Sequence, residues 1–281
     1  MLHASPDNRA LDDGFAPFER IGGASASGLL FICDHAGAGI PASYCGLGLP
    51  PEALQRHIAY DIGAAALTRA LAQAFRAPAV LASFSRLLID PNRGHDDPTL
   101  VMRYSDGAIV PGNACIEAGE IEHRRRRYWA PYRDAVAGMA DDMIAAGEPP
   151  AIVSMHSFTP IWRGAARVWK VGVLWDRDPR LPSALLAALG REPDLAAAEI
   201  GDNEPYDGAL LGDTIDAIAT PRGLSNALIE VRQDLIGDAA GVEAWAARLA
   251  RLIRPQVGKA ERRPQDFGSR ASEKIFRRSR L

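Results

Sequence analysis

Short apolar runs alternate with amphipathic stretches along most of this chain. Apolar runs that are typical of buried strands lie at 28–33, 79–82, 86–89, 151–155, 168–174 and 226–231. Amphipathic stretches that predict helices lie at 51–57, 61–76, 117–146, 181–189 and 239–253. Strands that alternate with helices indicate a mainly parallel sheet covered on both faces. The pattern therefore predicts an α/β protein, a single-domain three-layer α/β/α sandwich with a mainly parallel, mixed sheet.

Neither a linker nor an internal repeat interrupts this pattern before residue 258. We expect one domain at 21–258, an N-terminal extension at 1–20 and a tail at 259–281. The tail holds eight Lys and Arg against three Asp and Glu, although the whole chain has a net charge of −3. Because the tail lacks a sustained apolar face, we interpret it as a solvated, flexible terminus rather than a nucleic-acid or membrane patch.

The basic run HRRRR at 123–127 invites a nucleic-acid interpretation. Consecutive residues point all round a helix, however, so these arginines cannot form one stripe, and we expect a solvated helix. No apolar run approaches the ~20 residues that span a bilayer, and the first twenty residues lack the features of a secretory signal. We expect a cytoplasmic protein that binds neither nucleic acid nor membrane.

The three cysteines, Cys33, Cys45 and Cys115, lack the close spacing of a redox pair or a structural zinc site, and they suit a reducing compartment. Cys33 could be imagined as a nucleophile beside His35. Because it ends an apolar run, we expect it to be buried as a small hydrophobic residue.

Polar residues follow three of the predicted strands directly. His35 follows the first run, Asn92 and Arg93 lie just after 86–89, and His156 follows 151–155. Ligands bind at the carboxyl ends of strands in open α/β sheets, so we expect these residues to share a site. The long segment 90–114 is predicted to cover it. No nucleotide-binding or GxSxG pattern occurs, which argues against nucleotide binding.

His35 and His156 are the natural pair of metal ligands. A hydrolytic zinc usually takes three protein ligands from His, Asp and Glu and leaves one position for water. Asp34 adjoins His35 but would point away from it, whereas Asp61 opens a helix and could face the loop that holds His35. We favour Asp61 as the third ligand. The alternatives are a helix N-cap role for Asp61 and histidines held by backbone groups.

Glu230 lies inside the apolar run NALIEV, where an ionised carboxylate is costly unless it is paired or functional. A carboxylate beside an activated water can take its proton and pass it to the leaving amine. We interpret Glu230 as the general base and acid. The alternative is a buried ion pair with Arg232 or Arg93.

Planar donors cluster after the third run. Arg93 could hold a substrate carboxylate in a fork while Asn92 orients it, and Arg86 could polarise the scissile carbonyl or bind a second carboxylate. Pairing with neighbouring aspartates is the alternative. The turn-rich segment GDNEPYDG could present Asn203 and Tyr206 to a ligand. Together these residues suit a small substrate that bears a carboxylate.

Six segments carry a resemblance to a known family: CDHAGAGIP, HIAYDIGA, SRLLIDPNR, MHSF, GDNEPYDG and IEVRQDLI, in that order between residues 33 and 236. With them the chain resembles the N-formylglutamate amidohydrolase family, which is similar to the zinc carboxypeptidases and aspartoacylases. The resemblance implies a phosphorylase/hydrolase-like sandwich, one Zn²⁺, a glutamate base and arginines for the substrate carboxylates.

Carried over by motif, His35 and His156 match the zinc histidines, Glu230 the catalytic glutamate, and Asn92 with Arg93 the pair that grips a carboxylate. Ser157, in MHSF, joins the candidates for substrate binding. The related hydrolases use an HxxE motif, whereas HAGA puts Ala38 in place of its glutamate, so the third ligand must come from elsewhere.

The resemblance implies hydrolysis of N-formyl-L-glutamate to formate and L-glutamate, a late step of histidine breakdown. Two alternatives stay open: a zinc hydrolase of another N-acyl amino acid or small peptide, and a non-catalytic binding protein that has lost the metal. The oligomeric state is not indicated.

Overall fold

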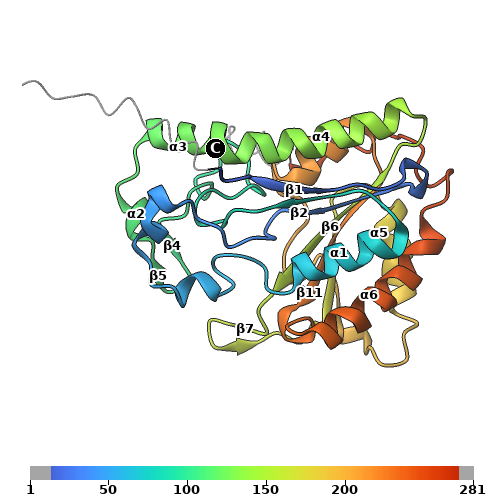
Figure 1. The fold of residues 1–281 in the computed structure, drawn as a ribbon. Coiled ribbons are helices and arrows are strands. Elements are labelled where there is room, and N and C mark those ends of the chain that lie inside the picture. Colours follow the sequence, from blue (N-terminus) through green and yellow to red (C-terminus); the bar gives the residue numbers. More distant parts are fainter. Residues whose placement is uncertain (1–13, 272–281) are drawn as a thin grey trace, which may run out of the picture.

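A seven-stranded, mostly parallel sheet forms the centre of the computed structural model, which describes residues 14–271 (Figure 1). The strand order is β1-β3-β2-β6-β11-β9-β10; β1 and β9 run antiparallel to their neighbours β3 and β11, and the other pairs are parallel. The strands are β1 Phe18–Ile21, β2 Leu29–Cys33, β3 Ala79–Ala82, β6 Ala151–Phe158, β9 Val171–Leu174, β10 Ile200–Asp202 and β11 Asn226–Arg232.

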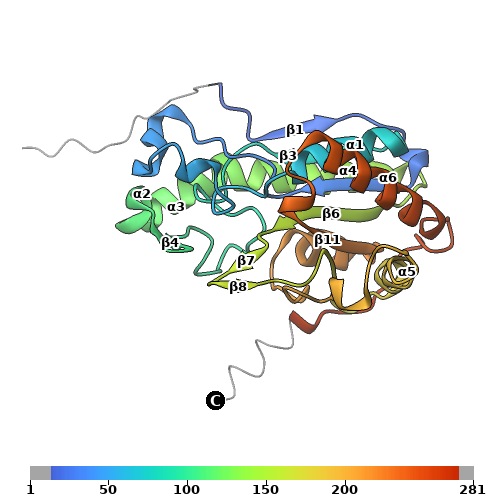
Figure 2. The same ribbon diagram turned by 90° about the horizontal axis from the view of Figure 1, so that it is seen from below.

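Both faces of this sheet are covered, because its central strands are apolar on both sides. Leu29, Phe31 and Cys33 of β2 point to one face, and Leu30 and Ile32 point to the other. The first face packs against α1 (Ala64–Phe75), α5 (Arg180–Leu189) and α6 (Ala239–Ile253), and the second against α4 (Ala130–Ala145). Figures 1 and 2 show these two helical layers. The predicted three-layer α/β/α sandwich is confirmed, and Cys33 is buried as expected.

One predicted strand is wrong. Residues 86–89 form a buried turn, in which the amide of Leu88 donates to the carbonyl of Ser85 at 2.9 Å. The amide of Arg86 donates to Ala59 and the carbonyl of Leu87 accepts from the side chain of Asn113. The residues are apolar because the turn is buried. The Ala59 carbonyl and the Asn113 side chain supply the backbone hydrogen bonds that a neighbouring strand would otherwise supply.

The predicted helix at 117–146 is interrupted rather than simply bent at Pro131. Helix α3 (Ala118–Arg124) passes through a π-helical turn at Arg125–Trp129 into α4. Such a turn accommodates the proline, which has no backbone N–H to donate. The expectation of a wholly solvated arginine run also needs correction, because Arg124 is buried and donates to the Leu88 carbonyl and the Asn113 side chain.

The predicted domain boundaries need correction at both ends. Strand β1 pairs with β3, so the sheet already begins inside the expected extension at 1–20. After residue 258, the buried Arg262 donates to the carbonyls of Val257 and Pro149, and Arg270 pairs with Asp176. The expected flexible tail is therefore packed on the domain as far as residue 271, and 272–281 lie outside the described residues.

Two short hairpins stand at the edge of the sheet where the parallel strands end (Figure 2). One is β4 (Tyr104–Ser105) with β5 (Ala108–Ile109), followed by α2 (Pro111–Ala114); the other is β7 (Ile161–Trp162) with β8 (Ala165–Ala166). The predicted helix at 51–57 is only the 3₁₀ turn Ala53–Gln55. None of the helices in residues 14–271 has the length and apolar character needed to cross a membrane.

Candidate active site

A cavity of about 410 Å³ opens at the carboxyl ends of β2, β6 and β11. Most of the residues singled out from the sequence line it, and Asn203 does not. The lining members are His35, Asp61, Arg86, Asn92, Arg93, His156, Ser157, Tyr206 and Glu230. The topology thus brings together side chains that lie up to about 200 residues apart, as expected for an open α/β sheet.

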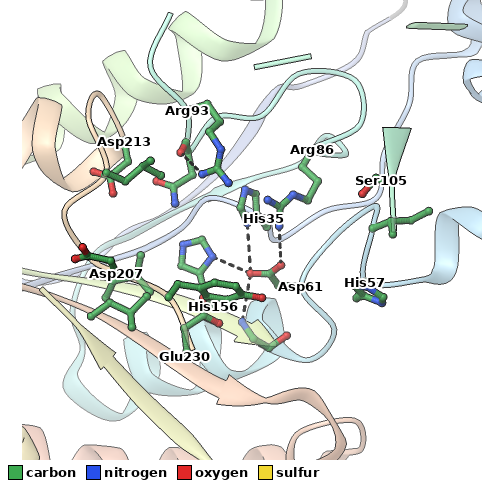
Figure 3. A pocket seen from close by; sticks show the side chains of 18 of the residues that line it. His35, His57, Asp61, Arg86, Arg93, Ser105, His156, Asp207, Asp213 and Glu230 are labelled. Carbon is green, nitrogen blue, oxygen red and sulfur yellow. Dashed lines mark hydrogen bonds and ion pairs between the residues drawn. The ribbon is translucent and has the colours of Figure 1, made fainter. Parts of the chain in front are cut away.

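His35, Asp61 and His156 form a buried group whose candidate ligand atoms all lie within 4.8 Å of one another. Asp61 Oδ2 is 2.8 Å from His156 Nδ1 and 3.4 Å from His35 Nδ1 (Figure 3). Asp61 does not cap helix α1, whose N-cap is Gly63. His35 Nδ1 is buried without a hydrogen-bond partner. Two imidazoles and a carboxylate around an unpartnered nitrogen fit a divalent metal ion, and Asp61 supplies the carboxylate that the HAGA sequence lacks.

Two further carboxylates hold the far sides of the histidine rings. Asp90 Oδ1 lies 2.7 Å from His35 Nε2, and Asp34 Oδ2 lies 3.2 Å from His156 Nε2. The Nδ1 atoms of both rings are left facing Asp61, in the arrangement by which carboxylates orient metal-binding histidines. Burial alone would raise the pKa of Asp61. The charge interaction with His35 and the hydrogen bond to His156 outweigh burial and hold this pKa below its usual value. Burial likewise opposes a charged His156, but its bonds to Asp34 and Asp61 raise its pKa.

Asp34 is the most heavily hydrogen-bonded of these carboxylates. It is fully buried, and it accepts hydrogen bonds from side chains of α4 and β6 and from the Thr214 hydroxyl. Oδ1 accepts from Tyr132 and Thr214, and Oδ2 from Ser154 and His156. Burial opposes its charge, but these donors, led by His156, keep the pKa of Asp34 below its ordinary value.

Glu230 lies beside the candidate metal group, because it stands opposite His156 in the β11–β6 register. Its Oε2 is buried without a hydrogen-bond partner. Neither alternative ion pair forms, since Arg232 pairs with Asp234 and the described residues hold no pair between Glu230 and Arg93. Burial, partly opposed by His156, raises the pKa of Glu230 to about 7. A carboxyl group that titrates near neutrality suits proton transfer in both directions.

Arg93 is a cation available to a ligand. Its guanidinium donates to Thr99 Oγ1 and to the Asn92 carbonyl, and no carboxylate within residues 14–271 pairs with it. The Asn92 side-chain oxygen accepts from the Thr214 amide at 3.2 Å, which leaves its NH₂ group for the cavity. The alternative, in which Arg93 pairs with a neighbouring aspartate, is not found among residues 14–271.

Arg86 is instead engaged on the protein side. Its guanidinium lies 3.0 Å from Asp90 and 3.6 Å from Asp61, and its Nε is buried without a partner. Burial disfavours the charge, but Asp90 and Asp61 keep the pKa of Arg86 above its ordinary value. Because two carboxylates already balance its charge, Arg86 is better placed to polarise a carbonyl near Asp61 than to bind a free carboxylate.

The two candidates from the GDNEPYDG loop have different positions. Tyr206 lines the cavity, whereas the Asn203 side chain accepts from the amides of Trp175 and Gly208 and so holds the loop in shape. The loop is pressed onto glycines of the sheet, because a Cβ on Gly172 would collide with the Glu204 carbonyl oxygen. Gly201 is constrained in the same way.

Ser157 lines the cavity from β6, which extends to Phe158 and so includes His156 as well. Its hydroxyl donates to the Ile62 carbonyl at 2.8 Å, and its amide donates to Asp61 Oδ2 at 3.3 Å. Both bonds lock the segment that carries Asp61 against β6. Ser157 therefore positions Asp61 as well as lining the cavity.

The sequence reasoning missed several side chains around the cavity. The orienting roles of Asp34 and Asp90 and the lining residues His57, Trp162 and Asp213 were not predicted. Asp213 is buried, and burial followed by the charges of Asp34 and Asp216 raises its pKa to about 7. The positions of Asp34 and Asp90 directly after apolar runs were the signal in the sequence that could have identified them.

Comparison with known proteins assigns the chain to a family. A crystal structure of a gene product from Agrobacterium tumefaciens is 33% identical with a TM-score of 0.81, covering 89% of this chain and 98% of that one. The N-formylglutamate amidohydrolase from Ralstonia eutropha is 21% identical with a TM-score of 0.66, covering 86% and 97%, which shows the same fold. No curated protein matched. Because the family model for N-formylglutamate amidohydrolase matches residues 27–237, this chain belongs to the N-formylglutamate amidohydrolase family.

Proposed function

We propose that this protein is a zinc-dependent amidohydrolase that cleaves a small N-acyl amino acid, with N-formyl-L-glutamate as the leading substrate. The observation that carries the proposal is the buried group His35, Asp61 and His156, with the unpartnered carboxylate oxygen of Glu230 beside it. Imidazole and carboxylate are the ligands of catalytic zinc sites. When bound, the ion would supply Lewis acidity and lower the pKa of a water molecule.

The substrate would be held by its carboxylate. Arg93, which has no ion pair in the described structure, would bind this group in a fork, and the NH₂ group of Asn92 would fix its orientation. Such a contact would put the amide between Glu230 and Arg86, which line the same cavity. Arg86, fixed by Asp90 and Asp61, would stabilise negative charge on the carbonyl oxygen during attack.

Glu230 would move the protons. In its ionised form it accepts a proton from the attacking water, and the water oxygen forms the new bond to the carbonyl carbon. The same carboxyl group then donates that proton to the amide nitrogen as the C–N bond breaks. One water is consumed, and a carboxylic acid and a free amino acid are released. A pKa of about 7 allows both halves of this cycle.

The direct test is formate release from N-formyl-L-glutamate by purified protein, by protein treated with a chelator, and by chelated protein resupplied with zinc. Metal content is measured on the same samples. Activity that chelation abolishes and zinc restores would support the proposal. Bound zinc without turnover would remove this substrate from the proposal, and a protein that neither retains zinc nor cleaves the amide would contradict it.

A further inference from the structure

The cavity continues beyond the candidate metal group in two directions. Figure 3 shows Arg93 and Asp213 on one side of His35, Asp61 and His156, and Ser105 and His57 on the other. Cavities of about 300–1,000 Å³ commonly hold drug-sized ligands. N-formyl-L-glutamate is much smaller than such ligands, so the 410 Å³ cavity has room that this substrate leaves empty.

The geometry of an amide decides which half of a substrate enters each side. The peptide-like C–N bond is planar and trans, so its acyl and amine substituents point in opposite directions. With the substrate carboxylate on Arg93, the amine half fills the side that carries Arg93 and Asp213. The acyl group is then directed past Arg86 toward His57 and Ser105.

The walls on this acyl side come from three separate segments. The β4–β5 hairpin contributes Ser105 and Asp106, the β7–β8 hairpin contributes Trp162, and the loop before Asp61 contributes His57. The His57 ring lies 6.4 Å from the Trp162 ring in an edge-on contact, and its Nε2 lies 3.3 Å from Asp106. His57 therefore joins both hairpins into one wall.

The segments that build this side also carry sizeable apolar groups that line the cavity. Ile58 and Met102 also line the cavity, next to His57 and three residues before Ser105 in the chain, and Trp162 adds its indole. A formyl group carries only a hydrogen beyond its carbonyl carbon, so it offers these side chains no methyl or methylene group to contact. Longer acyl chains offer several.

We infer that the pocket formed by His57, Ile58, Met102, Ser105, Asp106 and Trp162 is an acyl subsite that accepts short aliphatic acyl groups larger than formyl. The inference rests on the proposed amide hydrolysis, and it extends the substrate class to N-acetyl, N-propionyl and N-butyryl amino acids. Each methylene buried against these walls should raise kcat/KM by up to about fourfold.

The test uses N-acetyl-, N-propionyl- and N-butyryl-L-glutamate beside the formyl compound with zinc-loaded protein. Within the three alkyl compounds, which have similar intrinsic reactivity, kcat/KM should rise with chain length. Trp162→Ala should lower the butyryl-to-formyl ratio of kcat/KM about tenfold. The matched control is Ile161→Ala, the neighbouring residue of β7, which is 59% exposed and does not line the cavity; its ratio should equal that of the unmodified protein.

Binding separates a failure of the subsite from a failure of the proposed function. Calorimetry with zinc-loaded Glu230→Gln protein should show N-butyryl-L-glutamate binding at least tenfold more tightly than the formyl compound. Equal or weaker butyryl binding, or a Trp162→Ala effect that is the same for every acyl group, would overturn the subsite. If longer acyl groups bind more tightly but no compound is cleaved, the subsite stands and the hydrolytic function falls.

Discussion

Replacement of Asp34 by asparagine tests the polar network behind the candidate metal ligands. The variant keeps the shape of the side chain but replaces one acceptor oxygen by an NH₂ group. Asp34 now accepts from Tyr132, Ser154, Thr214 and His156, two donors to each oxygen. In either orientation of the amide, two of these donors lose their acceptor.

The size of the effect follows from these contacts. A hydrogen bond to a charged group contributes about 1.5–3 kcal/mol, so two lost bonds predict a loss of roughly 3–6 kcal/mol. The loss expected when one partner of a buried charged pair is removed, about 3–5 kcal/mol, agrees with this range. We therefore expect Asp34→Asn to lower the free energy of unfolding by about 4 kcal/mol, a large part of the ~5–15 kcal/mol that stabilises a typical protein.

The assay is urea denaturation of the metal-free protein at neutral pH, followed by zinc titration of the folded variant. Zinc affinity should fall about 10–100-fold, because the carboxylate that orients His156 becomes a neutral amide. Asp194→Asn is the control: this exposed carboxylate pairs with Arg248 on the surface and its replacement should change neither quantity. An Asp34→Asn protein as stable as the unmodified chain would refute the network argument, and normal zinc affinity would refute the orienting role.

Three further outcomes are expected. Glu230→Gln should lower kcat by about 10²–10⁴ while metal analysis finds its zinc content unchanged, because only proton transfer is removed; full activity would contradict the role. Arg93→Ala should chiefly raise KM, and Arg93→Lys should recover only part of the loss because lysine cannot form a fork; an unfolded circular dichroism spectrum would instead indicate a structural role. Asp213 has a folded pKa near 7 against 3.8 for the free side chain, so its proton stabilises the fold at low pH and this stabilisation is lost as pH rises through 7. Asp213→Asn should remove up to about 4 kcal/mol of that pH dependence between pH 4 and 8, measured by denaturation, and an unchanged slope would contradict the buried carboxyl.

The parts of the fold that could be predicted from the sequence are those in which one local signal dominates. The strand with Leu29 and the strand with Glu230 were identified because an uninterrupted apolar run is needed where both faces of a sheet are covered. The same signal failed at 86–89, because a buried turn needs apolar side chains as much as a strand does. Only the distant donors and acceptors of Ala59 and Asn113 distinguish the two.

The site divides in the same way. His35 and His156 were proposed from predicted strand ends and from a resemblance, Asp61 was proposed from its place at the start of a predicted helix, and the structure brings all three together. Asn203 was proposed from turn chemistry, which identifies a loop but does not say which side chain faces inward. The contact between His57 and Trp162 joins residues more than a hundred positions apart. No local sequence pattern predicts such a contact, because it depends on how two segments distant in the sequence pack against each other in the folded protein.

The glycines beneath the GDNEPYDG loop limit how this family can diversify. Any side chain at Gly172 or Gly201 would push the loop, and Tyr206 with it, off the sheet. Two hairpins form another part of the cavity wall. Their turn glycines, Gly107 and Gly164, have open space around them but adopt φ angles of +79° and +82°, which disfavour a side chain. Substitutions should therefore be tolerated in the hairpins outside these two turn glycines, and disfavoured at Gly172 and Gly201. A directed-evolution library for new acyl specificity would be best confined to the hairpins, with the tyrosine loop kept intact.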